Sequence, residues 1–147
     1  MVKRTSLEGD ACPIARSLDA IGDWWSLLII RDAFLGVRRF SAFQRSLGLA
    51  KNILTVRLRA LVDRGILATV PASDGSAYRD YVLTPKGRGL FPILVALRQW
   101  SEEFDEHPDE IATMLVDRAQ RRPVRKLLLR AEDGTPLAPE DTALAPR

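Results

Sequence analysis

Cys12 is the residue in this sequence with the clearest capacity for covalent chemistry. It directly precedes Pro13, and proline is typical of the first position of a helix, whose N-terminal dipole stabilises a nearby thiolate. Arg16 adds positive charge one turn further on. The pattern predicts one of two states. Either the thiol is reactive and open to alkylation, oxidation or bonding to Cys12 of a second subunit, or Cys12 is a small side chain packed at the helix start.

Other groups suited to catalysis or metal binding are sparse. Cys12 and His107 are the single cysteine and the single histidine, and they lie far apart in the sequence, with His107 in an acidic stretch. The sequence has no glycine-rich phosphate loop and no metal-ligand spacing. One cysteine also excludes a disulfide framework within the chain and a cysteine-rich zinc cluster. We therefore expect no enzyme activity, no cofactor and no metal.

A second set of side chains is suited to contacting nucleic-acid bases. In a helix over residues 51–64, Leu54, Leu58 and Leu61 share one face. The opposite face then carries Asn52, Thr55, Val56 and Arg59. Asparagine can pair with adenine and arginine with guanine, while a valine or threonine methyl can contact the thymine methyl. The set predicts base contacts in the major groove, with an ordinary solvated face as the alternative.

The charge distribution supports a polyanion partner. Residues 38–62 contain six basic side chains and no acidic one, whereas residues 102–117 contain seven acidic side chains and no Lys or Arg. We predict phosphate contacts for Arg39, Ser41, Arg45 and Lys51. Arg79 lies in the second strand of a β-hairpin that is described below. Its side chain either contacts a phosphate, contacts the minor groove or is only solvated. Arg57 lies between the buried and exposed faces of its helix, which fits a phosphate contact or an internal salt bridge.

These side chains need helices that hold them in place. Apolar periodicity and stop signals predict helices over 13–21, over 24–35 with Asp23 as N-cap, and over 41–47. Ser41 and Gln44 form the S-x-x-Q pattern of a capping box at the start of the third helix. A glycine-containing turn joins this helix to the one over 51–64. The pair is therefore a helix-turn-helix.

A β-hairpin and a long helix follow. Strands are predicted over 66–70 and 78–83, with Asp74-Gly75 at the tip of the hairpin. A hairpin at this place in a helix-turn-helix protein is a wing. Thr84 and Pro85 then begin a helix that extends to about Phe104, with a bend at Pro92.

The remaining sequence predicts an extension of mixed structure. We expect a helix over 110–121, a strand over 124–130, a hairpin turn at Asp133-Gly134 and a loosely ordered segment over 136–147. The predicted fold class is mainly α (α+β), a winged helix-turn-helix with a β-hairpin wing and added N- and C-terminal dimerisation helices. We expect residues 1–107 to form a DNA-binding domain with its dimerisation helices and residues 108–147 to form a C-terminal extension.

The first and last long helices carry more apolar surface than a domain of this size can cover. The candidate dimer interface consists of Ile14, Leu18, Phe91, Leu94, Leu97 and Trp100. The alternative is that these side chains pack on their own domain. The longest apolar run, over 24–30, is far below the roughly 18 to 20 residues that a membrane span needs, so we expect a soluble, cytoplasmic protein with no membrane partner.

Several stretches resemble the HxlR family, bacterial winged helix-turn-helix regulators related to the MarR type. The matching residues are Cys12-Pro13, Leu18, Ile21-Gly22-Asp23, Trp25, Leu27-Leu28-Ile29, Arg31-Asp32, Gly36, Arg39-Phe40-Ser41, Phe43, Leu54, Arg57-Leu58, Leu61, Gly65-Ile66-Leu67 and Tyr81-Val82-Leu83-Thr84-Pro85-Lys86-Gly87. The resemblance as a whole covers about residues 12 to 104. Trp24 and Ala50 depart from the family pattern, and Ala50 leaves the 51–64 helix without a side-chain cap.

The resemblance implies a homodimer that binds a roughly palindromic operator on double-stranded DNA and regulates neighbouring genes. It also implies a response to electrophiles or oxidants, for which Cys12 is the candidate sensor. We therefore expect a transcriptional repressor with an inverted-repeat operator. One alternative is a ligand-responsive regulator without cysteine chemistry, and another is a winged helix used for protein or RNA contacts.

Overall fold

The computed structural model describes residues 5–105, 107–109 and 113–147. The chain forms two compact units, Met1–Leu94 and Val95–Arg147, and each is described here by itself. The division at residue 107 between a DNA-binding domain and an extension stays a prediction. No helix among the described residues has the length and apolar character needed to cross a membrane.

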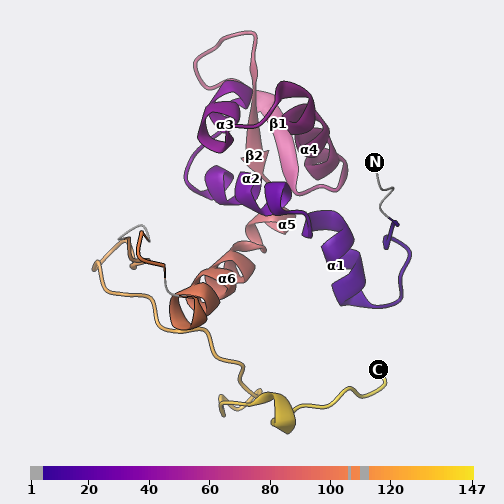
Figure 1. Ribbon diagram of the computed structural model, residues 1–147, viewed down its shortest axis with the longest axis vertical. Coiled ribbons are helices and arrows are strands. Elements are labelled where there is room, and N and C mark those ends of the chain that lie inside the picture. The colour runs from indigo at the N-terminus through magenta and orange to yellow at the C-terminus, as the bar shows by residue number, and fades with distance from the viewer. Residues whose placement is uncertain (1–4, 106, 110–112) are drawn as a thin grey trace. The chain divides into compact units, whose positions relative to one another are not determined.

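The first unit is a winged helix-turn-helix, as predicted. Its elements in chain order are α1 (Pro13–Ile21), α2 (Trp24–Phe34), α3 (Phe40–Leu47), α4 (Lys51–Asp63), β1 (Leu67–Pro71), β2 (Arg79–Leu83) and α5 (Pro85–Arg88). Figure 1 shows the hairpin of β1 and β2 beside α3 and α4. The strands pair antiparallel in the register that places Leu67 opposite Leu83 and Pro71 opposite Arg79. The fold class is therefore confirmed.

Hydrogen bonds fix the starts of α2 and α3. Asp23 caps α2, because its side chain accepts a hydrogen bond from the Ser26 backbone N–H at 2.9 Å. The predicted capping box of Ser41 and Gln44 is wrong. The Tyr81 N–H donates to the carbonyl of Arg38, which holds the extended chain until Arg39, so α3 begins one residue before Ser41. Gln44 instead donates from Nε2 to the carbonyl of Leu49.

One hydrophobic core holds α2, α3 and α4 against the hairpin. Its most deeply buried side chains are Ile29, Ile30, Phe43, Leu54, Leu58, Leu61, Ile66 and Leu67. The turn between α3 and α4 passes through Gly48, whose φ of 64° lies in the left-handed region that favours glycine. Ala50 begins α4 without a side-chain cap, as predicted.

The single helix predicted from Pro85 to Phe104 is wrong. The chain forms α5, ends it at Gly89, and starts a separate helix, α6 (Phe91–Phe104). Proline lacks an N–H and clashes with the preceding turn inside a helix, whereas it is tolerated in the first turn. The break at residues 89–90 places Pro92 in that first turn of α6.

The second unit has little regular structure after α6. The helix predicted over 110–121 is wrong for residues 113–121, and residues 110–112 lie outside the described part of the chain. Asp117 accepts hydrogen bonds from the backbone N–H groups of Gln120 and Arg122, which closes a tight turn in place of a helix. The strand predicted over 124–130 is also wrong, because the backbone of Arg125 and Leu127 bonds to the side chain of Gln99.

The end of the chain contains a turn and one short helix. The turn at Asp133-Gly134 is confirmed, with a φ of 89° at Gly134 and an isolated bridge between Arg130 and Pro136. A 3-10 helix, η1 (Pro139–Asp141), follows, and the residues after it are exposed.

Candidate nucleic-acid interface

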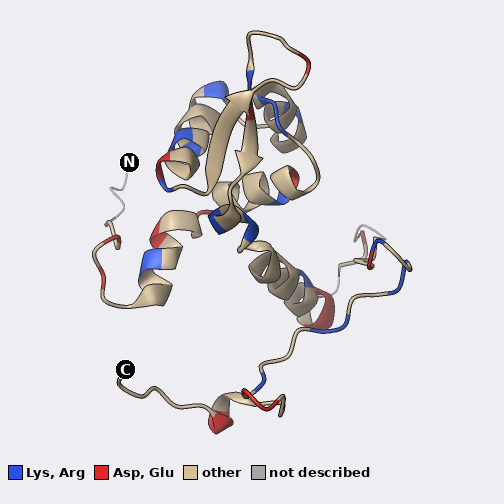
Figure 2. Ribbon diagram, turned by 180° about the vertical axis from the view of Figure 1, so that it is seen from behind, with Lys and Arg blue, Asp and Glu red and all other residues tan. Residues whose placement is uncertain are grey.

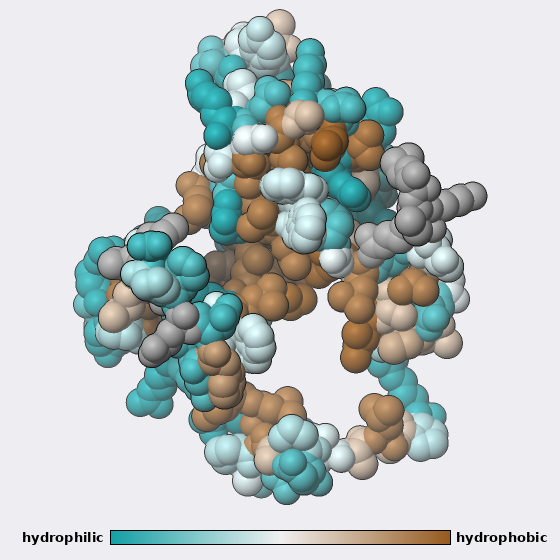
Figure 3. Space-filling view, viewed as in Figure 1, coloured by the Kyte–Doolittle hydropathy of each residue, from teal (hydrophilic) through white to brown (hydrophobic). Residues whose placement is uncertain are grey.

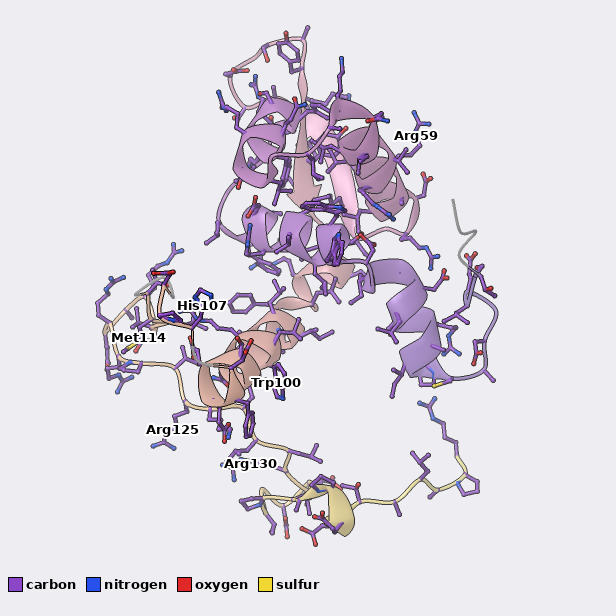
Figure 4. The ribbon with its side chains drawn as sticks, in the orientation of Figure 1. Arg59, Trp100, His107, Met114, Arg125 and Arg130 are labelled. Atoms are coloured by element: carbon purple, nitrogen blue, oxygen red, sulfur yellow. The ribbon has the colours of Figure 1, made fainter. Side chains whose placement is uncertain are left out.

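The outer face of α4 carries the predicted base-contacting side chains. Asn52, Thr55, Val56 and Arg59 are all exposed, and Val56 has 62% of its surface accessible. Leu54, Leu58 and Leu61 on the opposite face are at most 1% exposed. Figure 4 shows Arg59 projecting away from α4 into solvent. Burial of one face of α4 thus presents the other to a partner.

Exposed basic side chains accompany this face. Lys and Arg positions recur along α4 (Figure 2), and Lys51 at its start is exposed. Ser41 and Arg45 on α3 are exposed as well. Four N-terminal N–H groups of an α-helix lack partners within the helix, so the start of α4 also offers donors to an anion. The arrangement suits contact with phosphates on either side of a groove.

Arg57 has a partner inside the unit. Its Nε lies 3.6 Å from Oδ1 of Asp23, the residue that caps α2. This contact corresponds to the internal salt bridge, one of the two alternatives predicted for Arg57 from its position between the buried and exposed faces of its helix. It ties α4 to the start of α2.

Arg39 connects the start of α3 to the wing. Its Nη2 lies 2.6 Å from Oδ2 of Asp74, and its Nε lies 3.2 Å from Oδ1 of Asp80. Its Cζ stands 5.6 Å from the ring centroid of Tyr78. The hydrogen bond from Arg39 to Asp74 raises the pKa of the guanidinium. Arg79, by contrast, is exposed and donates from Nη2 to the carbonyl of Thr69 in the paired strand.

These wing contacts include residues that the sequence analysis did not select. Asp80 and Tyr78 had no predicted role, and Asp74 was identified only as part of the turn. The available signal was an acidic residue inside a strand, since a carboxylate in a buried strand position needs a charged partner. Only the structure identifies that partner as Arg39.

Cys12 is exposed and forms the N-cap of α1. Its backbone N–H donates to Oδ1 of Asp10 at 2.8 Å. Arg16 donates from Nη1 to the carbonyls of Asp10 and Ala11, so its guanidinium is bound to the backbone beside Cys12. Within one chain the thiol is accessible, which differs from the packed alternative.

The predicted interface residues fall into two groups. Ile14 and Leu18 on α1 are 69% and 50% exposed, and Figure 3 shows hydrophobic side chains at the surface there. Leu97 and Trp100 on α6 are also exposed. Phe91 packs on Phe34 with ring centroids 4.9 Å apart, and Leu94 packs against the core of the first unit. Phe91 and Leu94 therefore pack at least partly within their own domain.

Comparison with known proteins gives consistent matches. Residues 20–109 match the family described as HxlR-like helix-turn-helix. The uncharacterised HTH-type transcriptional regulator MT3179 of Mycobacterium tuberculosis is 42% identical over 102 residues, which cover 69% of this chain and 63% of that protein. This chain thus spans less than two thirds of the length of that relative.

Two solved structures are similar as well. PA1607, a candidate transcription factor, is 56% identical with a TM-score of 0.89, and the match covers 96% of this chain and 99% of that chain. The redox regulator HypR in its oxidised form is 30% identical with a TM-score of 0.58, over 65% of this chain and all of that chain.

The Asp74 carboxyl provides a test of the wing geometry. Its pKa is lowered to about 2, first by the backbone N–H of Ser76, then by the Ser76 hydroxyl, and then by Arg39. We expect Arg39→Ala to raise this pKa only part of the way to 3.8, because the N–H of Ser76 remains. An NMR titration of the side-chain carboxyl carbons measures it.

The sign of the pH effect follows from the lowered value. Ionised Asp74 contributes stability that is complete above about pH 4 and is lost as pH falls through about 2. Asp133 is the control, since Thr135 lowers its pKa without an arginine and Arg39→Ala should leave it unchanged. A wild-type Asp74 midpoint near 3.8 would contradict the described contacts.

Proposed function

Since this chain belongs to the HxlR-like helix-turn-helix family, we propose that it is a transcriptional regulator that binds an operator on double-stranded DNA through α3, α4 and the wing. The similar proteins are named as regulators or transcription factors and not as enzymes, which agrees with the role expected from sequence. The observation that carries the proposal is the exposed polar face of α4 opposite three buried leucines.

The proposed mechanism divides the side chains by task. The outer face of α4 enters the major groove, where Asn52 and Arg59 pair with purine edges and Val56 and Thr55 contact thymine methyls. Ser41, Arg45 and Lys51 bind phosphates and fix the register of α4 without selecting sequence. Arg79 extends the contact along the wing. Arg57 stabilises α4 through Asp23.

Two substitutions separate base contacts from phosphate contacts. Arg59→Ala should weaken binding to a duplex selected from a random library by about 1–3 kcal/mol and relax sequence preference at one position. Lys51→Ala should weaken binding to all duplexes alike and reduce the slope of log affinity against log salt by about 0.9. Fluorescence anisotropy at several salt concentrations measures both.

Arg130→Ala is the matched control, because Arg130 is an exposed arginine of the second unit. It should leave the affinity and its salt dependence unchanged. Selection that yields no preferred duplex would argue against the proposed function and for a protein or RNA partner.

We also propose that the protein acts as a homodimer through an apolar stripe on α6, defined as Leu97, Trp100 and Phe104. These three are 49%, 61% and 68% exposed and recur at helical spacing, and the rings of Trp100 and Phe104 lie 6.2 Å apart. Figure 4 shows Trp100 projecting from α6. The exposed apolar residues of α1, Ile14 and Leu18, are a separate proposed contact with a partner subunit.

The chain itself covers the part of α6 next to this stripe. Arg98 hydrogen-bonds to Thr113, Gln99 binds the backbone of Leu127 at 2.8 Å, and Glu103 pairs with Lys126. On a helical wheel Arg98 and Gln99 lie away from the apolar stripe, whereas Glu103 lies beside Trp100. Trp100 and Phe104 line a pocket with Lys126 and Leu127 but stay 61% and 68% exposed, so a second copy is able to cover the remaining surface of the stripe.

Leu97→Glu tests this interface. A buried leucine contributes about 1.5–3 kcal/mol, and a twofold interface loses it twice, so we expect a shift from dimer to monomer in sedimentation at micromolar concentration. Leu144→Glu is the control, because Leu144 is fully exposed near the chain end. A Leu97→Glu protein that remains dimeric, or a wild-type protein that is monomeric throughout, would rule out the stripe.

We further propose that Cys12 makes DNA binding sensitive to oxidants. Its exposure at the N-cap of α1 supports this role, as does similarity to HypR, which is named a redox regulator. Two Cys12 thiols from two subunits would form one disulfide and transfer two protons and two electrons to the oxidant. The bond would constrain α1 and with it the spacing of the α4 helices.

Diamide, which accepts two electrons and two protons, serves as the oxidant. It should lower the affinity of wild type for its selected duplex and leave Cys12→Ser unaffected, with a crosslinked dimer visible on a non-reducing gel only for wild type. An equal response of both proteins would exclude the thiol role. A regulator that responds to a ligand without cysteine chemistry would then be favoured.

A further inference from the structure

Arg39 makes side-chain contacts with three residues of the wing, which we call the wing latch: Asp74 at the hairpin tip, Tyr78 in the loop and Asp80 in β2. Arg39 itself is the N-cap residue of α3, so it belongs to the helix-turn-helix. A single guanidinium therefore joins the two parts of the fold that the proposed function brings to DNA. Its planar donors suit this task because they bind two carboxylates at once.

The contact with Asp80 is the buried half of the wing latch. The Asp80 side chain is only 3% exposed, and among the described residues Arg39 is its ion-pair partner. A buried carboxylate without a partner is strongly destabilising. The Arg39 side chain is consequently held in one place by Asp80, whatever else it contacts.

The contact with Asp74 changes the charge of the hairpin tip. Residues 72–78 contain one acidic residue, Asp74, and no Lys or Arg. An uncompensated carboxylate at this point would be repelled by phosphates. The guanidinium 2.6 Å away offsets it in part, because the same positive charge also pairs with Asp80.

The hairpin tip and β2 depend on Arg39 to different degrees. The Tyr81 N–H donates to the carbonyl of Arg38 at 2.8 Å, so β2 is fixed to the start of α3 without any side chain. Loss of the latch should therefore loosen residues 72–78 and leave the paired strands in place. Hydrogen-bonded N–H groups at Ala72, Gly75 and Ser76 report on that loop.

We propose that Arg39 is a positioning residue that fixes the wing loop, residues 72–78, to the start of α3 and offsets the negative charge of Asp74, in place of the direct phosphate contact predicted from sequence. The inference rests on the proposed function for its effect on DNA. It predicts that residues 72–78 are ordered in the free protein.

Two carboxylate substitutions distinguish positioning from phosphate binding. Asp80→Asn removes a negative charge, so simple electrostatics predicts stronger DNA binding. The latch predicts weaker binding to the selected duplex, by about tenfold if the wing is correctly placed a tenth of the time, with the salt slope unchanged. Asp74→Asn breaks only the exposed half and should loosen the tip alone.

Amide hydrogen exchange supplies a readout without DNA. Arg39→Ala and Asp80→Asn should both accelerate exchange at Ala72, Gly75 and Ser76, and thermal melting verifies that each variant folds. If Arg39→Ala does not fold, Arg39→Ala combined with Asp80→Asn removes the unpaired buried charge. Arg45→Ala is the matched control, since it should leave exchange unchanged and reduce the salt slope by about 0.9.

The outcomes separate the two proposals. Unchanged exchange in Asp80→Asn overturns the latch, and faster exchange with unchanged DNA affinity overturns its positioning role. A wild-type protein that selects no duplex overturns the proposed function, while hydrogen exchange still decides whether Arg39 fixes the wing.

Discussion

Burial of Leu54, Leu58 and Leu61 against the core is the constraint on which the arrangement of the first unit depends. These leucines pack with Ile29 and Ile30 of α2, which forces the opposite face of α4 into solvent. That face carries Asn52, Thr55, Val56 and Arg59. The packing that stabilises the fold and the exposure that permits DNA contact are therefore consequences of one helical periodicity.

Charged side chains then fix the neighbouring elements to this core. Asp23 caps α2 and pairs with Arg57 of α4, so one carboxylate sets both the start of one helix and the position of another. Arg39 in turn joins the start of α3 to the wing through two carboxylates. Sequence alone assigns Arg39 to DNA and leaves Arg57 open between DNA and an internal salt bridge, yet both arginines pair with carboxylates within the domain. Charge pattern indicates a polyanion partner, but it does not indicate which cations are already paired.

The sequence predicted the elements whose signals are local. Apolar periodicity and stop signals predicted the first four helices, and Asp74-Gly75 predicted the turn of the wing. The predictions failed where distant residues decide the structure. The start of α3 depends on a backbone bond from Tyr81, 43 residues further on than Arg38, and residues 113–127 follow the side chains of α6 in place of their own helix and strand preferences. Asp80 was missed for the same reason, because its partner lies far away in the sequence.

Hydroxyl-radical footprinting of the wild-type protein on a duplex selected from a random library tests the central claim most directly. A dimer that inserts two α4 helices into successive major grooves should protect two symmetric segments, with centres about one or two helical turns, or 10 to 21 base pairs, apart. Uniform protection along the duplex, or none at salt concentrations that suppress non-specific binding, would contradict the assignment of α4 as the surface that recognises DNA.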